Sequence, residues 1–278
     1  MSRLPEAFFL PREPAGPGQL YCLLHRPVKG QTVRGAIVYV HPWCEEMNKS
    51  RRMAALQARA LAAQGWAVLQ VDLLGCGDSS GDFGDASWTG WIADVVAAAH
   101  WLRARFDAPH WLWGLRAGCL LACEAARQLR GPTNLLFWQP VASGKLLLQQ
   151  FLMLRLAGLM NDGKAQGVIQ GLRNDLSAGQ AVEVAGYVLA PALADGLAVA
   201  SLRPPPQAGR AIWLEVLPQP GGTPSPALLQ AQKSWAEAGT AVQLAVVGGP
   251  QFWQTTEVED APELVGATLD QLATGWPA

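Results

Sequence analysis

Charged residues are scarce in this sequence, and neither sign dominates. Only 15% of its 278 residues are Asp, Glu, Lys or Arg, and the formal net charge is −1. A protein that binds nucleic acid through its phosphates needs a basic field, which this composition does not provide. The low charge and the 50% share of hydrophobic residues indicate one large domain with a sizeable core, and we expect residues 1–278 to form it.

Cysteine and histidine are too sparse to build familiar centres. The five cysteines include no pair at metal-ligand spacing, and their number is odd. We therefore expect reduced thiols, no metal, no cofactor and a cytoplasmic location. The four histidines are His25, His41, His100 and His110, so the chain contains none after position 110.

Long apolar runs are missing as well. No stretch reaches the roughly 18 apolar residues of a membrane span, and the start of the chain lacks the apolar centre of a secretory signal. The richest candidate, 146–160, is interrupted by Gln149, Gln150 and Arg155. We expect no transmembrane segment. Residues 146–160 are expected to be buried under a cap or, alternatively, to offer an apolar surface to a partner protein.

The sequence does contain a regular alternation of apolar strands and amphipathic helices. The expected strands cover 19–25, 35–40, 66–71, 110–113, 134–138, 211–217 and 242–247. The expected helices begin near Ser50, after a cap at Ser87, and near positions 117, 227 and 262. This order predicts an α/β protein with a mostly parallel sheet and helices on both faces.

One turn is more informative than the rest. Residues 114–118, Gly-Leu-Arg-Ala-Gly, join an expected strand to an expected helix, which is the context of a nucleophile elbow. The two glycines suit a strained turn with a helix packed close behind it. The segment resembles the α/β-hydrolase superfamily, and we expect that fold. Where the superfamily carries a nucleophile, however, this sequence has Arg116, whose guanidinium stays protonated and cannot attack.

Two further segments resemble α/β-hydrolase landmarks. Residues 72–81 resemble a glycine-rich loop whose role in the superfamily is structural. Residues 143–202 interrupt the alternation with apolar helical stretches around a polar middle at 161–164. The superfamily inserts a cap over its pocket at this point, so the resemblance implies a helical cap insertion here.

The other members of a catalytic triad are missing. In this fold an acid and then a histidine follow the nucleophile along the chain. All four histidines precede Arg116, and the loop 218–226 after the strand 211–217 contains no carboxylate. We therefore expect no Ser-His-Asp hydrolysis, and the residues alone leave any catalytic group unknown.

The candidate pocket is formed by the loop after strand 35–40, the elbow and the tail after strand 242–247. Its residues are His41, Trp43, Cys44, Glu45, Glu46, Leu115, Arg116, Phe252 and Trp253. Phe252 and Trp253 occupy the usual place of the histidine, where they either close the pocket, stack on a sugar ring or pack under the last helix. The stretch 48–50 is expected to start and cap the following helix.

Arg116 has two interpretations. Beside helix N-terminal amides it would favour an anionic ligand group such as a carboxylate or phosphate. Alternatively it pairs with Glu45 or Glu46, since a buried charge requires a partner. A carboxylate beside Arg116 is expected to have a lowered pKa, which would make it a poor general acid.

Three segments together point to a narrower resemblance. The loop His-Pro-Trp-Cys-Glu-Glu-Met-Asn-Lys-Ser-Arg-Arg-Met (41–53), the elbow 114–118 and the tail Gly-Pro-Gln-Phe-Trp-Gln-Thr-Thr-Glu (249–257) look like the exosortase A system-associated hydrolase of the second type. That resemblance implies a gene context of PEP-CTERM sorting and exopolysaccharide production, and a protein partner from that cluster.

Two functions follow as hypotheses. The first is a non-catalytic protein that keeps the pocket and binds a small anionic, glycan or acyl ligand. The second is a hydrolase or acyl-transfer enzyme that acts on an exopolysaccharide, glycolipid or peptide ester without a triad. The residues favour the first, whereas the resemblance supports the second.

Overall fold

The computed structural model describes residues 4–13, 16–157 and 167–274. Eight strands form one sheet in the order β1-β2-β4-β3-β5-β6-β9-β10. Their bounds are β1 Glu6–Pro11, β2 Gln19–His25, β3 Gly35–Val40, β4 Trp66–Val71, β5 His110–Leu115, β6 Thr133–Trp138, β9 Ala208–Leu217 and β10 Val242–Gly248. Strands β3 to β6, β9 and β10 run parallel, whereas β1 and β2 are antiparallel to their neighbours. The predicted mostly parallel sheet is confirmed.

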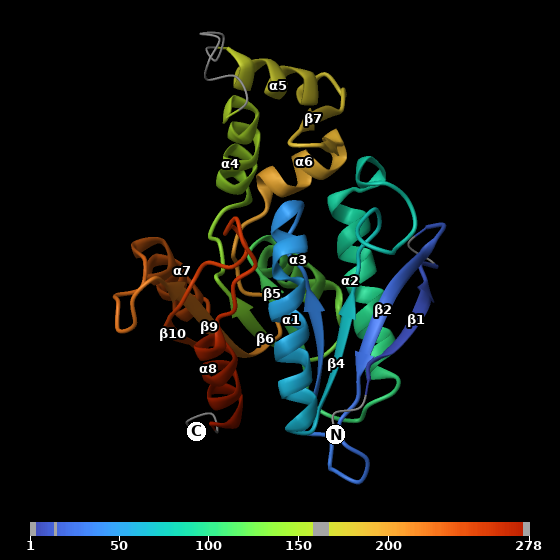
Figure 1. Cartoon of the computed structure of the whole chain (residues 1–278), viewed down its shortest axis with the longest axis vertical. Coiled ribbons are helices and arrows are strands. Elements are labelled where there is room, and N and C mark those ends of the chain that lie inside the picture. The colour runs from blue at the N-terminus through green and yellow to red at the C-terminus, as the bar shows by residue number, and fades with distance from the viewer. Residues whose placement is uncertain (1–3, 14–15, 158–166, 275–278) are drawn as a thin grey trace.

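Helices cover both faces of the sheet, as the alternation predicts (Figure 1). Their bounds are α1 Glu45–Ala63, α2 Trp88–Arg103, α3 Ala117–Gln128, α7 Pro226–Glu237 and α8 Pro262–Ala273. Helices α1 and α8 share one apolar cluster with the sheet, and α2, α3 and α7 share the other. The core therefore consists of two layers, one on each side of a sheet whose central strand β3 is buried along its whole length.

The edge strand β1 was not predicted from the sequence. It pairs antiparallel with β2 over residues 6–11. The prolines at positions 5, 11, 14 and 17 conceal it, because proline interrupts a strand pattern. Proline is nevertheless tolerated at the edge of a sheet and at strand ends, where no ladder hydrogen bond is lost.

Helix α1 begins earlier than the sequence predicts, which corrects the expected start near Ser50. The helix starts at Glu45, and its N-cap Cys44 makes no side-chain cap bond. The stretch 48–50 therefore lies inside the helix and does not cap it. Ser50 donates from its hydroxyl to the Glu46 carbonyl oxygen at 2.6 Å. Two acidic residues in the first turn complement the helix dipole and favour the early start.

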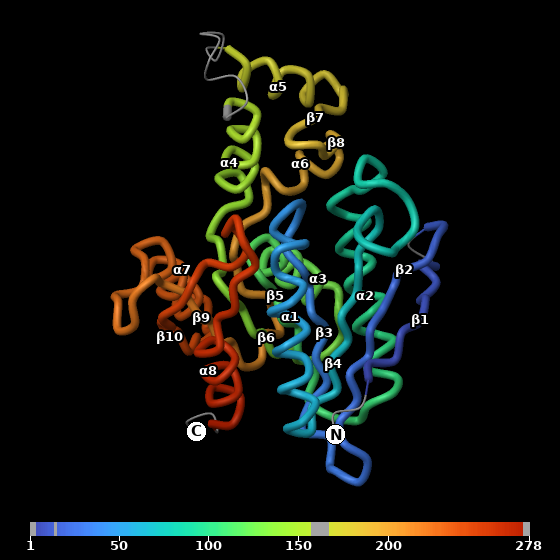
Figure 2. Tube along the Cα trace, in the orientation of Figure 1, coloured from blue at the N-terminus to red at the C-terminus, as the bar shows by residue number. Residues whose placement is uncertain are grey.

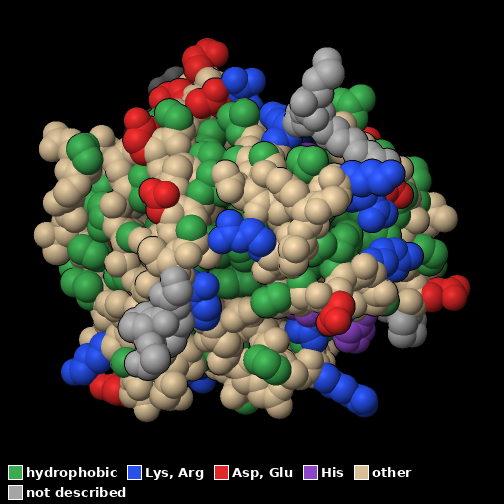
Figure 3. Space-filling view, turned by 90° about the horizontal axis from the view of Figure 1, so that it is seen from below, with side chains coloured by type: hydrophobic (Ala, Val, Ile, Leu, Met, Phe, Trp, Pro, Cys, Tyr) green, Lys and Arg blue, Asp and Glu red, His purple; other side chains and the backbone are tan. Residues whose placement is uncertain are grey.

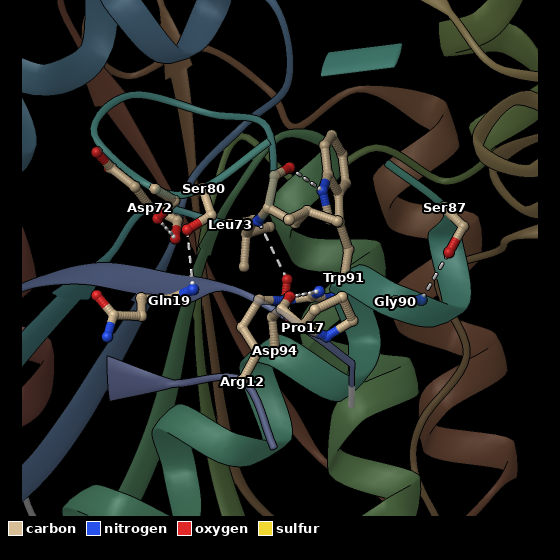
Figure 4. A network of polar contacts seen from close by, with 12 residues as sticks. Arg12, Pro17, Gln19, Asp72, Leu73, Ser80, Ser87, Gly90, Trp91 and Asp94 are labelled. Atoms are coloured by element: carbon tan, nitrogen blue, oxygen red, sulfur yellow. Dashed lines mark hydrogen bonds and ion pairs between the residues drawn. The ribbon is translucent and has the colours of Figure 1, made fainter. Parts of the chain in front are cut away.

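Asp94 on helix α2 contacts both the glycine-rich loop 72–81 and Arg12, which follows β1 (Figure 4). Arg12 Nε donates to Asp94 Oδ1 at 2.8 Å, and both side chains are almost completely buried. Asp94 Oδ2 accepts the Leu74 backbone N–H at 3.1 Å, and Trp91 Nε1 donates to the Leu74 carbonyl oxygen at 2.9 Å. These bonds are consistent with the structural role expected for the loop. Ser87 caps α2 as predicted, by accepting the Gly90 N–H at 3.1 Å.

The segment between β6 and β9 lies above the carboxyl ends of the parallel strands. It contains α4 Gly144–Ala157, α5 Val168–Ser177, β7 Val182–Val184, β8 Tyr187–Leu189 and α6 Pro191–Val199. The chain rises through α4 and returns through α6 to β9 (Figure 2). The polar stretch 161–164 and the end of the apolar stretch 146–160 lie outside the described residues. That 143–202 acts as a cap stays a prediction.

The surface agrees with the weak net charge. On the face opposite α4 and α5, Lys and Arg side chains are scattered among uncharged ones and do not merge into one basic field (Figure 3). Over residues 4–13, 16–157 and 167–274, no helix is both long enough and apolar enough to span a bilayer. All five cysteines are free and buried.

Candidate functional site

The turn between β5 and α3 places Arg116 directly after the carboxyl end of β5, an inner strand of the sheet. Arg116 is the N-cap of α3 and adopts φ 54° and ψ −116°, a conformation that residues with a Cβ rarely adopt. Its N–H donates to the Trp138 carbonyl oxygen at 3.1 Å, and its carbonyl oxygen accepts the Cys119 N–H at 3.0 Å. The turn therefore has the strained strand-to-helix form of a nucleophile elbow.

The two glycines of the turn allow close packing. A Cβ at Gly114 would lie 2.6 Å from the Cys119 Cα, and a Cβ at Gly118 would overlap the Val40 carbonyl oxygen. Both clashes are with backbone atoms, which cannot rotate away. Glycine is thus required at both positions because the helix lies directly against its own strand and against β3.

A cavity of about 640 Å³ opens beside Arg116, between the strand ends and the segment that contains α4, β7 and β8. Its volume is within the range of ordinary small-molecule sites. The lining residues are Trp43, Cys44, Glu45, Glu46, Lys49, Arg116, Gln139, Leu147, Gln150, Phe151, Leu154, Ala185, Tyr187, Gln251, Trp253 and Gln254.

Backbone strain is concentrated around this cavity. Within the described residues, four non-glycine residues have a positive φ, and all four line it. They are Cys44 (52°), Arg116 (54°), Gln139 (44°) and Ala185 (51°). Such strain costs of order 1–3 kcal/mol per residue and persists where the surroundings hold it in place, commonly at functional sites. The strain marks this cavity as the candidate functional site.

Arg116 forms an ion pair with Glu46 from the first turn of α1. Its Nε donates to Glu46 Oε1 at 3.1 Å, and its Nη2 lies 3.1 Å from the same oxygen. The two side chains are 15% and 20% exposed. The second carboxylate oxygen, Glu46 Oε2, is buried and has no hydrogen-bond partner among the described residues. Of the two interpretations of Arg116, the structure therefore shows the internal ion pair, and its partner is Glu46.

Glu45 faces the rim of the cavity and makes different contacts. Its Oε2 accepts hydrogen bonds from the Tyr187 hydroxyl at 3.1 Å and from Asn48 Nδ2 at 3.3 Å. Asn48 also donates to the Tyr187 hydroxyl at 3.2 Å. These bonds connect the start of α1 to strand β8, so Glu45 helps to position the wall of the cavity.

The expected lowering of the carboxylate pKa beside Arg116 is wrong. Burial raises the pKa of Glu46, and the charge and hydrogen bond of Arg116 offset only part of this rise. The physical reason is that Glu46 loses most of its water while only one of its two oxygens gains a partner.

His41 is held in a structural role away from Arg116. Its Nδ1 lies 2.6 Å from the Pro42 carbonyl oxygen, and its Nε2 lies 3.2 Å from the Leu73 backbone nitrogen. The Leu73 N–H can only donate, so Nε2 must accept and Nδ1 carries the proton. The ring lines a separate cavity of about 180 Å³ between β2 and α1. Both nitrogens are engaged, which leaves no lone pair for a general base.

Acid should destabilise this arrangement. Burial lowers the pKa of His41, so the folded ring stays neutral where an unfolded histidine binds a proton, below about 6.5. The unfolded state then binds more protons, and the free energy of unfolding should fall as pH decreases from 6.5, by at most about 1.4 kcal/mol per pH unit for one histidine. Denaturant titrations of wild type and His41→Gln between pH 5 and 7.5 would measure this.

A matched control is His100→Gln on α2, which replaces an exposed histidine. His41→Gln should show a shallower pH dependence than this control. Burial also lowers the pKa of His25, so some dependence should remain in His41→Gln. Equal slopes in the two variants would contradict a neutral His41 in the folded state.

The cysteines near the site are unsuited to nucleophilic attack. Burial raises the pKa of Cys44, which lines the cavity, and raises the pKa of Cys76 to about 12. A thiol with a raised pKa carries little thiolate at neutral pH. Cys44 instead serves as the strained N-cap of α1.

Two further residues of the expected pocket, Leu115 and Phe252, do not line the cavity. Leu115 is completely buried in the cluster between the sheet and α1. Phe252 is also buried, edge-on against Trp138 and Trp253, so it does not line the cavity. Trp253 does line it, and the Arg116 guanidinium lies 5.9 Å from its ring centre. The aromatic pair therefore mainly packs, which leaves little ring surface for stacking on a sugar.

Sequence reasoning missed the uncharged polar lining. Gln139 follows β6, Gln150 projects from α4, and Gln251 and Gln254 belong to the loop after β10. Glutamine has no single characteristic role, so no motif pointed to these four side chains. The position of Gln139 at a strand end was the available signal, because ligands bind at the carboxyl ends of parallel strands.

The acid that precedes the loop after β9 has a structural role. The acid nearest the loop after β9 is Glu215, which is buried within the strand. Its Oε2 accepts the Ser225 N–H at 2.8 Å and so fixes the start of α7. No group of three or more His, Cys, Asp or Glu side chains suited to a metal ion occurs in the described part of the chain.

Comparison with known proteins supports the fold and leaves the activity open. Residues 18–146 are similar to the X-Pro dipeptidyl-peptidase family (S15 family). No curated protein matches the chain in sequence.

Solved structures resemble the chain over nearly its full length. Est1E from Butyrivibrio proteoclasticus, with ferulic acid bound, is 16% identical and covers 96% of this chain and 100% of its own, with a TM-score of 0.67. A serine hydrolase without a lid from Xanthomonas campestris is 16% identical and covers 100% of this chain and 99% of its own, with a TM-score of 0.56. A putative hydrolase from Agrobacterium vitis is 14% identical and covers 97% of this chain and 100% of its own, with a TM-score of 0.57. The chain therefore has the α/β-hydrolase fold.

Proposed function

We propose that this protein is a non-catalytic, ligand-binding α/β-hydrolase-fold protein that acts in an exosortase A and PEP-CTERM system. The observation that carries the proposal is Arg116 at the strained elbow, paired with Glu46 beside a cavity of about 640 Å³. A positively charged residue stands where the fold would present a nucleophile, while the pocket itself is kept.

The alternative, hydrolysis or acyl transfer without a triad, needs a nucleophile activated by a general base. His41 has both ring nitrogens engaged by the backbone, and the buried thiols hold their protons at neutral pH. Glu46 shares one oxygen with Arg116. These contacts favour binding over catalysis.

The biological context rests on the resemblance of segments 41–53, 114–118 and 249–257 to the exosortase A system-associated hydrolase of the second type. The structure supports their importance, since all three contribute lining residues to the same cavity. The five free cysteines support a cytoplasmic location. A partner protein from the same gene cluster remains part of the proposal.

The proposal predicts that the pure protein does not hydrolyse activated esters. Turnover of p-nitrophenyl acetate and butyrate should equal the buffer rate, and a fluorophosphonate probe should label no serine. Arg116→Ser should be equally inactive, because it supplies a hydroxyl without a base and triad members act as a unit.

An active serine hydrolase assayed in parallel controls for the quality of the substrates and the probe. Turnover well above background, with stoichiometric labelling of a single serine, would contradict the proposal. Activity gained only in Arg116→Ser would show that a base exists near the elbow.

A further inference from the structure

The charges that line the cavity cancel each other. They belong to two acids, Glu45 and Glu46, and two bases, Lys49 and Arg116. The Arg116 guanidinium is already neutralised at its Nε and Nη2 by Glu46. An anion that contacts Arg116 would have to displace Glu46 or lie next to its carboxylate. Two negative charges so close together repel each other. The pocket therefore does not favour a charged ligand.

Glu46 and Arg116 nevertheless leave hydrogen-bonding capacity at the base of the cavity. Glu46 Oε2 is buried without a partner, and Arg116 Nη1 makes no hydrogen bond to a described residue. A buried carboxylate oxygen without a partner is costly. The Glu46 side chain is 20% exposed, so a small rotation of its carboxyl group would bring this oxygen to the cavity surface, where a hydroxyl that donates to it removes that cost. The site thus offers one strong acceptor beside one strong donor, and this combination matches two adjacent hydroxyl groups.

The glutamines extend the same chemistry around the cavity. Each amide offers donors and an acceptor without a charge. Gln139 uses its Oε1 to accept the Val216 N–H at 2.7 Å, which leaves its amino group for other contacts. Gln254 donates to Gln251 Oε1, which leaves its own carbonyl oxygen. No hydrogen bond joins Gln150 to another described residue.

An apolar wall faces these polar groups. It consists of Leu147, Phe151 and Leu154 on α4 together with Trp43, whose ring lies against Phe151 at 4.7 Å between centres. Mixed apolar walls with a few convergent polar groups are typical of sites for small molecules. A ring that carries hydroxyl groups at its edge and C–H groups on its face satisfies both surfaces.

We infer that the cavity binds an uncharged polyhydroxylated ligand such as a neutral sugar ring. One hydroxyl donates to the Glu46 carboxylate, the oxygen of a neighbouring hydroxyl accepts from Arg116, and the glutamine amides contact the remaining hydroxyls. The inference rests on the proposed binding function and selects the glycan among its three ligand classes, against an anion or an acyl chain.

The test is a binding screen by isothermal titration and ligand-observed NMR with the full-length protein. Neutral probes are glucose, galactose, mannose, rhamnose, N-acetylglucosamine and their disaccharides. Charged probes are glucuronate, glucose 6-phosphate and inorganic phosphate, and hexanoate represents the acyl class. At least one neutral sugar should bind, and the matched uronate should bind more weakly because its carboxylate meets Glu46.

Variants locate the binding. Glu46→Gln keeps the shape but replaces a charged acceptor, so affinity for the neutral sugar should fall roughly 10-fold or more, the equivalent of about 1.4 kcal/mol. Glu237→Gln on α7 removes the same charge at an exposed site and should bind like wild type. Gln254→Ala, at the exposed rim, provides a second reading if Glu46→Gln does not fold.

The results separate this inference from the proposed function. Binding of phosphate or hexanoate without any neutral sugar would overturn the inference and leave a non-catalytic binding protein in place. No binding by any probe overturns it too, as does sugar binding that neither Glu46→Gln nor Gln254→Ala weakens. Ester turnover by the wild type overturns the proposed function, whichever ligand binds.

Discussion

Arg116→Ala should lower the free energy of unfolding by about 2 kcal/mol at pH 7.5, because it removes the cation that pairs with the Glu46 carboxylate. The loss is smaller than for a completely buried pair, since both side chains remain partly exposed. Arg116→Ala combined with Glu46→Gln should be more stable than Arg116→Ala alone, because the double variant leaves no orphan charge. Urea denaturation of the wild type, Arg116→Ala, Glu46→Gln and the double variant gives the four free energies of unfolding that a double-mutant cycle requires.

The pH dependence of Arg116→Ala checks the cause. Glu46 has a raised pKa in the folded state, so a neutral carboxyl is favoured there, and stability is lost as pH rises through that pKa. The destabilisation relative to wild type should therefore be larger at pH 7.5 than at pH 5. A destabilisation that does not change with pH, or exact additivity in the cycle, would refute a coupled pair.

Backbone strain at the elbow gives a companion variant. Arg116→Gly loses the same ion pair as Arg116→Ala but relieves the positive φ of 54°. Relief of about 1–3 kcal/mol exceeds the roughly 0.5–1 kcal/mol that glycine costs in chain entropy. The glycine variant should therefore be the more stable of the two. The opposite order would show that the turn is relaxed.

Gly118→Ala should destabilise the fold by about 3 kcal/mol or more. The added methyl group would overlap the Val40 carbonyl oxygen and approach the His41 carbonyl oxygen at 2.8 Å. Neither backbone atom can yield unless α3 moves away from β3. Thermal and denaturant unfolding would measure the effect, and circular dichroism would report whether the variant folds.

Gly266→Ala on α8 is the matched control. No atom lies within 4 Å of the position that its Cβ would take, and the residue is exposed inside a helix. Alanine should therefore stabilise the protein here, by roughly 0.5–1 kcal/mol. Equal effects of the two substitutions would mean that glycine is required at 118 for a reason other than close packing.

Most of the sheet could be predicted from the sequence because its strands are buried on both faces. The run 35–40 has no charged or amide side chain and 66–71 has only one, Gln70, a pattern that is typical of a parallel strand between two helical layers. The edge strand β1 escaped prediction because four of its six residues are exposed, and because Pro5 precedes it and Pro11 ends it. The start of α1 was placed too late because residues 45–52 are charged or polar except for Met47, so their sequence shows little apolar periodicity.

The candidate site was predicted in part. The positions of Arg116, Glu46 and Trp253 around one cavity follow from the rule that strand ends meet at one edge of the sheet. The exclusion of Leu115, Phe252 and His41 from that cavity does not follow from the sequence, because the direction of a side chain within a loop depends on its tertiary neighbours.

The sequence by itself determined that arginine occupies position 116 in the turn after β5 and that no histidine follows it. It also determined the glycines that allow α3 to lie against β3, since these depend on residue identity and on local geometry. Only the tertiary structure decided which carboxylate meets Arg116, because Glu45 and Glu46 are adjacent and helix α1 turns them in different directions. It also decided that burial outweighs the arginine in setting the Glu46 pKa, and that four glutamines from three segments line one cavity. Both depend on which distant segments pack together and how much water they exclude, which no local pattern encodes.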